Sequence, residues 1–181
     1  MRQLKSIITC LTLLTLLGCG GGGADRGGNA DLSPGGNAPL PGSVDERSVS
    51  LLLEATPIQG DEWSLMLSAE DATDIYQLAG SVLFDPTMYE ITSVEAGGGL
   101  GGPEDAYFVN SSADEGKLDF GYTSRWFGRV NSGDLNLLRL RVRALGDFSL
   151  GDFSLPLEPD SLRVRDSQKR ELEPSLRRAG S

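Results

Sequence analysis

LAGSVLFDPTMYEITSV, residues 78–94, contains two apolar stretches separated by a turn signal. From Tyr76 to Phe84 apolar and polar side chains alternate, a period of two that predicts a half-buried strand rather than a helix. The Asp85-Pro86 step then ends this strand, because proline fixes φ and has no N–H to donate to a neighbouring strand. A second apolar stretch begins at Tyr89 and ends at Val94, so residues 76–94 predict two strands joined by a turn.

The same period of two extends outward from this stretch in both directions. Gly, Pro, Asn, Asp and Ser separate the apolar segments at short intervals, and no amphipathic helix longer than a turn or two is evident. Many short strands with frequent turns indicate an all-β domain, an antiparallel β-sandwich in which one face of each sheet meets the other. The other predicted strands are 48–53, 63–70, 106–109, 117–123, 135–143, 147–157 and 161–165.

Two local features interrupt the regular alternation. Leu135 and Leu137 share one phase, whereas Leu138, Leu140 and Val142 take the other, which predicts a bulge or bend near Leu137. Further on, GDFSL occurs twice in succession, over residues 146–150 and 151–155. Because a solenoid needs at least three copies of a longer unit, we interpret this echo as a local duplication within or beside one strand.

Two segments of the chain resemble cohesin domains. The first is residues 78–94, in which a strand ends in an aromatic-Asp-Pro turn before the next apolar strand, and the second is SGDLNLLRLRV, residues 132–142, followed by Gly146. With the strands between and around them, they cover most of residues 48–170. The chain departs from the pattern at Leu140, where an aromatic residue is common, and after Asp166, where a glycine often follows.

The resemblance to cohesin domains carries expectations about fold and partner. It implies a nine-stranded jelly-roll sandwich, related to carbohydrate-binding modules, that docks the calcium-loaded dockerin domains of polysaccharide-degrading enzymes. Both matching segments consist mainly of structural residues, so they bear on the fold more directly than on the ligand.

The first nineteen residues have the pattern of an export signal. Arg2 and Lys5 precede an apolar run, residues 7–17, that is shorter than the roughly 20 residues needed to span a bilayer. The run ends in LLGC, residues 16–19, which resembles the lipobox of bacterial lipoproteins. This resemblance implies that residues 1–18 are a cleaved signal peptide and that Cys19 becomes the lipidated N-terminus. It also implies an extracytoplasmic location, at the outer membrane if the host is Gram-negative, because Gly20 rather than aspartate follows Cys19.

Composition divides the remaining chain into three parts. Residues 19–45 are rich in Gly, Pro, Ala and Asn, so we expect a flexible tether spanning on the order of 25 to 30 Å. Residues 46–173 are expected to form the β-sandwich domain, with a length sufficient for its own core. The polar residues 174–181 are predicted to be a disordered tail.

Composition also excludes several kinds of chemistry. The chain has no His and two Cys, so loss of Cys10 with the signal and lipidation of Cys19 leave no thiol. Ser-His-Asp and Cys-His nucleophiles and zinc sites with His or Cys ligands are therefore excluded. The formal net charge of −10 becomes −12 once Arg2 and Lys5 are removed, which disfavours nucleic acid and anionic lipid as partners.

Two motifs that suggest cofactors have simpler explanations. GGGLGG, residues 97–102, spells G-x-G-x-x-G, but Pro103-Glu-Asp follows where a phosphate-binding helix would have to begin. The acidic residues at 71, 74, 114, 115 and 119 lack the spacing of an EF-hand calcium loop. We therefore expect no cofactor, no metal and no enzymatic activity.

The candidate binding surface consists of arginines and aromatic residues. RWFGR, residues 125–129, places Trp126 and Phe127 between Arg125 and Arg129 after a predicted strand, a composition typical of binding hot spots. The alternative is that Trp126 or Phe127 folds back to close the sandwich. The second group, Arg139, Arg141 and Arg143, shares one strand face and would form a basic stripe if Arg163 and Arg165 lay on a neighbouring strand. An ordinary solvated face is the simpler alternative.

Three functions are compatible with these observations. The first is a protein-docking module of cohesin type whose partner bears a dockerin. The second is a polysaccharide-binding module that uses Trp126, and the third is a structural lipoprotein of the cell envelope. In each, the protein is a non-catalytic monomer that contacts the membrane through its lipid alone.

Overall fold

The computed structural model describes residues 47–113, 115–126 and 128–179. The predicted signal peptide, the lipidation at Cys19 and the tether lie outside the described residues, as does Phe127. No helix among the described residues is long and apolar enough to cross a membrane.

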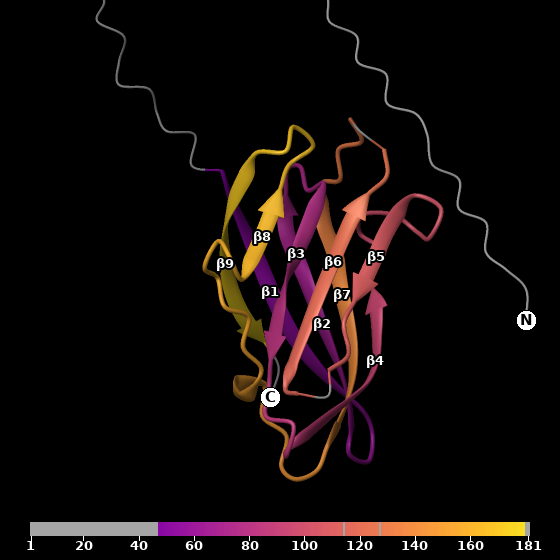
Figure 1. Ribbon diagram of the computed structural model, residues 1–181, viewed down its shortest axis with the longest axis vertical. Helices are drawn as coiled ribbons and strands as arrows, with labels where there is room; N and C mark the ends of the chain where they lie inside the picture. The colour runs from indigo at the N-terminus through magenta and orange to yellow at the C-terminus, as the bar shows by residue number, and fades with distance from the viewer. Residues whose placement is uncertain (1–46, 114, 127, 180–181) are drawn as a thin grey trace, which may run out of the picture. The chain divides into compact units, whose positions relative to one another are not determined.

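The described residues form nine β-strands and one short 3-10 helix (Figure 1). The predicted all-β class and strand number are confirmed. In chain order the elements are β1 (Ser48–Gln59), β2 (Glu62–Ala72), β3 (Gln77–Leu83), β4 (Tyr89–Ala96), β5 (Ala106–Asn110), β6 (Lys117–Ser124), β7 (Gly133–Ala144), η1 (Leu150–Asp152), β8 (Leu162–Arg165) and β9 (Glu171–Ala179).

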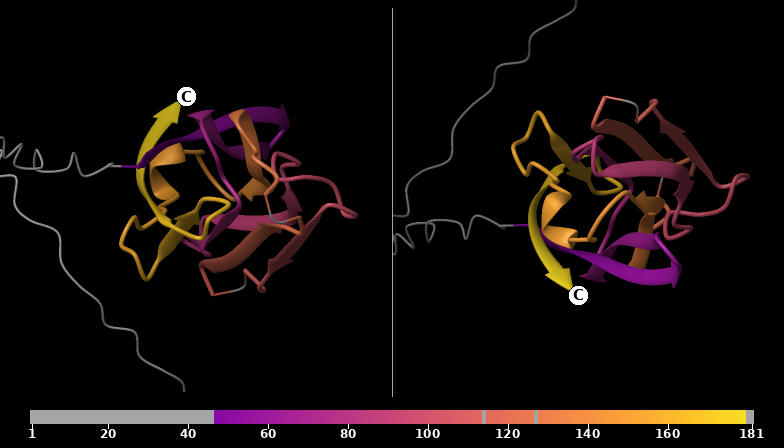
Figure 2. Two further views of the ribbon diagram at one scale, coloured as in Figure 1. Left: turned by 90° about the horizontal axis from the view of Figure 1, so that it is seen from above. Right: turned by 90° about the horizontal axis from the view of Figure 1, so that it is seen from below.

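Hydrogen bonding connects the strands in the order β4-β7-β2-β1-β9-β8-β3-β6-β5. β9 joins the two sheets of the sandwich, because it pairs with β8 through Glu171 and Leu172 and with β1 along the rest of its length. Seen along the domain, β9 (yellow) curves along one side (Figure 2). All ladders are antiparallel except β1–β9, which is parallel and departs from the antiparallel arrangement that we predicted. The outermost strands are β4 and β5.

The core lies between the inward faces of the two sheets. Leu51, Leu65 and Leu140 contribute from one sheet and Leu78 and Leu118 from the other, and all five are almost fully buried. Burying each such side chain stabilises the fold by about 1.5–3 kcal/mol. The strict alternation in the sequence therefore corresponds to alternation between this core and solvent.

The predicted irregularity near Leu137 is confirmed. Leu67 of β2 pairs with Leu138, but the next residue, Ser68, pairs with Asn136, so Leu137 is the extra residue of a bulge. Leu137 and Leu138 are both buried. The bulge lets one strand keep leucines facing the core on either side of the change in phase.

The prediction of a disordered tail over residues 174–181 is wrong for residues 174–179, because β9 extends to Ala179; residues 180–181 lie outside the described residues. Its residues 173–179 form a parallel ladder with residues 48–54 of β1. Leu172 and Leu176 pack against the core, although they are only partly buried. The polar composition reflects a strand whose other face is exposed.

The prediction of a strand over residues 147–157 is also wrong. This segment contains η1 and is connected to β3 by a single bridge, between Leu83 and Ser154. The two copies of GDFSL have different environments: Phe148 stacks on Trp63 with ring centroids 4.0 Å apart, whereas Phe153 is fully buried. The apolar residues of this segment cover the end of the core, and their spacing does not follow the period of two expected of a strand.

Candidate docking surface

The outer face of strands β8, β3, β6 and β5 forms a flat surface, which we call the platform. Its strand registers align the side chains in rows: one runs Arg165–Gln77–Thr123–Tyr107 and the next Arg163–Ala79–Gly121–Val109. Ser81 and Asp119 begin a third row. The platform is defined by Gln77, Ala79, Ser81, Tyr107, Val109, Asp119, Gly121, Thr123, Arg163 and Arg165.

The middle of the platform is low because its side chains are small. Ala79 of β3 lies opposite Gly121 of β6, and Val109 stands beside them on β5. A Cβ atom at Gly121 would lie 3.3 Å from a methyl group of Val109, so Val109 borders the space above the glycine. The result is a depression of about 500 Å³ between β3 and β5.

Large apolar side chains form the β5 side of the platform. Tyr107 is 60% exposed and Val109 is 66% exposed, on the outward face of an edge strand. The guanidinium of Arg125 lies over the Tyr107 ring, 4.1 Å from its centroid. Tyr107 and Val109 together offer exposed apolar area that a partner could bury.

Arginines form the opposite, β8 side of the platform. Arg163 and Arg165 both form ion pairs with Glu171 at the start of β9, whose Oε1 lies 2.8 Å from Arg165 Nη2 and 3.4 Å from Arg163 Nε. One carboxylate therefore orients two guanidinium groups. All three side chains remain substantially exposed, so the ion pairs are positioned to meet a partner and contribute little to stability.

Asp119 provides a carboxylate near the other end of the platform. Its Oδ1 accepts from the Ser81 hydroxyl at 2.5 Å and lies 2.9 Å from Lys117 Nζ. These contacts, the Ser81 hydrogen bond first among them, lower the pKa of Asp119 below its usual value. Asp119 therefore stays ionised throughout the neutral range.

The dimensions of the platform suit an α-helix. Neighbouring strands lie about 4.8 Å apart, so β8 and β5 are separated by roughly 14 Å. A helix with its side chains is about 10–12 Å wide. A helix can therefore lie along the strands over Ala79 and Gly121, between the arginines of β8 and the apolar side chains of β5.

The structure places Arg125, Trp126 and Arg129 of the predicted 125–129 group next to the platform, whereas Phe127 lies outside the described residues. Trp126 is 58% exposed, so the alternative in which it folds back into the sandwich is wrong for this residue. Its indole N–H donates to Asp105 Oδ1 at 3.1 Å, and Arg129 lies 3.5 Å from the other oxygen of the same carboxylate. Arg125 joins this segment to the platform through Tyr107.

The other predicted group lies on the other sheet. Arg139, Arg141 and Arg143 occupy the outward face of β7, between β4 and β2. They form no surface with residues 125–129, and the predicted stripe with Arg163 and Arg165 is wrong because β7 and β8 are not neighbours. Acidic side chains surround Arg143: its Nη1 lies 2.9 Å from Glu90, and Asp61 and Glu62 are within 3.9 Å of its guanidinium group.

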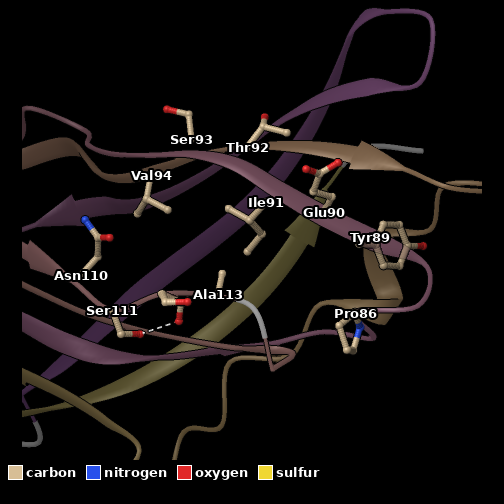
Figure 3. Close-up of a pocket in the computed structure, with 11 residues that line it drawn as sticks. Pro86, Tyr89, Glu90, Ile91, Thr92, Ser93, Val94, Asn110, Ser111 and Ala113 are labelled. Atoms are coloured by element: carbon tan, nitrogen blue, oxygen red, sulfur yellow. Dashed lines mark hydrogen bonds between the residues drawn. The ribbon is translucent and has the colours of Figure 1, made fainter.

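Two cavities open on the side of the sandwich between β4 and β5. The first, about 450 Å³, lies between β4 and residues 110–113. Ile91 and Val94 point towards Ala113 and Asn110, whereas Thr92 and Ser93 point away (Figure 3). The second, about 520 Å³, lies beside the glycine-rich loop, whose Gly101 carbonyl accepts from the Tyr122 hydroxyl at 2.5 Å. This loop leads into β5 and provides no helix N-terminus for a phosphate.

Among residues 47–113, 115–126 and 128–179, no three acidic side chains gather closely enough to hold a metal ion. The platform groups offer a partner shape, apolar area and charge. Sequence reasoning missed Tyr107, Val109, Ala79 and Gly121. Their outward position follows from the period of two, but their alignment across three strands depends on registers that the sequence does not display.

Comparison with solved structures identifies the fold. A type I cohesin–dockerin complex from Clostridium thermocellum matches with a TM-score of 0.56 and 16% identity, over 75% of this chain and 96% of the matched chain. A type II cohesin from Bacteroides cellulosolvens matches with a TM-score of 0.56 and 12% identity, over 71% and 95%. A non-cellulosomal cohesin from the archaeon Archaeoglobus fulgidus matches with a TM-score of 0.51 and 15% identity, over 74% and 88%.

No family model and no curated protein sequence matches the chain. The structural matches from Clostridium thermocellum and Bacteroides cellulosolvens nevertheless cover nearly the whole of each cohesin and almost three quarters of this chain. The domain therefore has the cohesin-like β-sandwich fold, which confirms the predicted fold class.

Proposed function

We propose that this protein is a non-catalytic docking module whose platform binds a dockerin-type protein. The observation that carries the proposal is the low floor of Ala79 and Gly121 beside the exposed Tyr107 and Val109. This combination accepts a helix and provides apolar area to bury beneath it. The matched structures include cohesins in complex with dockerins, which supports a partner of this class.

A side chain that fills the floor tests this proposal. We expect Gly121→Arg to weaken binding of a dockerin at least 100-fold, because the new side chain occupies the space the helix needs. The matched control is Ser64→Arg, which adds the same group to the outward face of β2 on the other sheet. Calorimetric titration of both variants with a panel of purified dockerins measures the effect. Equal affinities for the two variants, or no binding to the unmodified protein, would contradict the proposal.

We further propose that Cys19 carries a lipid that holds the module at the outer surface of a membrane. Two or more acyl chains give stable anchoring, whereas one chain gives only reversible binding. We expect Cys19→Ser to abolish incorporation of labelled palmitate and to move the protein from the detergent phase to the aqueous phase on Triton X-114 partition. Unchanged labelling in this variant would rule out Cys19 as the attachment site.

Glycan binding is a second candidate, favoured by the exposure of Trp126. Its hydrogen bond to Asp105 fixes the indole in an orientation that leaves much of the ring accessible. An aromatic ring held in this way can stack on a sugar ring, with Asp105 and Arg129 beside it as hydrogen-bonding groups. A glycan array with the native protein and Trp126→Ala tests this. Loss of signal only in the variant is expected, and a blank array with both proteins contradicts it.

A further inference from the structure

The charges around the platform are distributed unevenly along its strands. At the end marked by the Gln77–Thr123 row, Arg165 pairs with Glu171 on one side and Arg125 lies over Tyr107 on the other, while Arg163 lies one row further along, opposite Ala79. Among the described residues, Glu171 is the one carboxylate within ion-pair distance of any of these three arginines. With Arg165 and Arg125 against Glu171, this end carries a formal charge of about +1 at neutral pH.

The other end of the platform has the opposite charge. Asp119 and Asp160 border a depression of about 270 Å³ that Ser81 and Arg163 also line, and Lys117 pairs with Asp119. Two carboxylates and one ammonium give this end a formal charge of about −1, and Arg163, in the middle row, lies between the two ends. The gradient lies along β6, from Lys117 at the negative end to Thr123 at the positive end.

A helix placed on the platform interacts with this gradient through its own dipole. Its C-terminus has a partial negative charge and its N-terminus a partial positive charge. The favourable orientation therefore directs the C-terminus towards the end of the platform that carries Arg165 and Arg125. Acidic side chains in the last turns and basic side chains in the first turns of the helix add to the same preference.

From this geometry we infer that the platform selects a partner helix that runs in the same direction as β6 and has an acidic C-terminal half. The inference rests on the proposed docking function and specifies the chemistry of the partner. The rest of the domain supports the same selection, since the protein as a whole has a formal net charge of −10 and repels an acidic segment elsewhere.

Two synthetic helices test the inference directly. Both have 16 residues, the same stripe of Leu and Ala, and a hydrocarbon staple on the opposite face. The first has Lys in its N-terminal half and Glu in its C-terminal half, and the second has these charges exchanged. In isolation the second helix is the more stable of the two, because its charges complement its own dipole. If the protein nevertheless binds the first helix more tightly, that preference arises from the charges of the platform.

Binding is followed by fluorescence anisotropy at low salt with the full chain, and by NMR signals from Gly121 and Val109. We expect the first helix to bind at least fivefold more tightly than the second. The double variant Arg163→Gln/Arg165→Gln should reduce this preference to below twofold, and Arg163→Glu/Arg165→Glu should reverse it. The control Arg139→Glu/Arg141→Glu makes the same charge change on the other sheet and should retain the preference.

The possible failures can be distinguished. If neither helix shifts the NMR signals of Gly121 or Val109, the platform is not a docking surface, and both the docking proposal and the orientation preference are wrong. If both helices bind there with equal affinity, docking stands and the orientation preference is wrong. A preference that persists in both Arg163/Arg165 double variants, or that the Arg139/Arg141 control also abolishes, contradicts the assigned arginines. The Gln variant keeps the test valid if the Glu variant fails to fold.

Discussion

Tyr89 connects the core to the segment that closes the end of the sandwich. Its ring is buried and lies 4.7 Å from that of Phe153, and its hydroxyl donates to Asp152 Oδ2 at 2.6 Å. The same hydroxyl accepts from the backbone N–H of Ser149 at 3.0 Å. Burial, with the Asp152 hydrogen bond second, raises the pKa of Tyr89 above its usual value.

Removing this hydroxyl should destabilise the domain. We expect Tyr89→Phe to lower the free energy of unfolding by about 1–3 kcal/mol, because Asp152 and Ser149 lose a shared partner. Urea denaturation measures the change, and Tyr107→Phe is a control on an exposed ring that should stay within about 0.5 kcal/mol of the native protein. Equal stability of the two variants would show that the Tyr89 hydrogen bonds contribute nothing net.

The raised pKa of Tyr89 also has a consequence at high pH. The unfolded chain ionises this tyrosine first, so its contribution is complete below the usual tyrosine pKa and is lost as the pH rises through the higher folded-state value. We expect the native protein to lose stability more steeply than Tyr89→Phe above a pH of about 10. Parallel pH profiles from thermal unfolding would contradict this.

On the platform, Ser81 controls the ionisation of Asp119. Its hydroxyl makes the shortest contact to that carboxylate and is the main cause of the lowered pKa. We expect Ser81→Ala to raise the pKa of Asp119 towards its usual value. Titration of the Asp119 carboxyl carbon by NMR measures this, and an unchanged midpoint would assign the shift to Lys117 instead.

Among the elements, β9 was the hardest to predict. Its apolar residues, Leu172 and Leu176, are only half-buried, and its partner β1 lies more than a hundred residues earlier in the chain. A parallel pairing over that separation leaves no local signal. By contrast, the turn after Phe84 and the bulge at Leu137 were predictable, because proline chemistry and a change in phase are local features.

β9 should contribute strongly to stability because it joins the two sheets. We expect a chain that ends at Glu173 to lose roughly 3–6 kcal/mol in its free energy of unfolding, from several ladder hydrogen bonds and the packing of Leu176. Chemical denaturation of the shortened chain measures the loss. Stability within about 1 kcal/mol of the full chain would show that β9 is dispensable.

At the scale of the whole molecule, the two faces of the sandwich have different properties. On the outward face of β7, Arg143 lies among three carboxylates, those of Glu90, Asp61 and Glu62. The platform instead combines a low floor and exposed apolar side chains with two arginines, Arg163 and Arg165, that share the single carboxylate of Glu171. The sequence placed arginines on both faces, but the strand order was needed to show that they form separate surfaces.

Hydrogen–deuterium exchange with a bound dockerin tests the docking face most directly. The account predicts that binding slows exchange in residues 77–81, 107–109 and 119–123, with no change in residues 90–95 of β4 or 136–143 of β7. Protection confined to β4 and β7, or the absence of any protection on the platform in a confirmed complex, would contradict it.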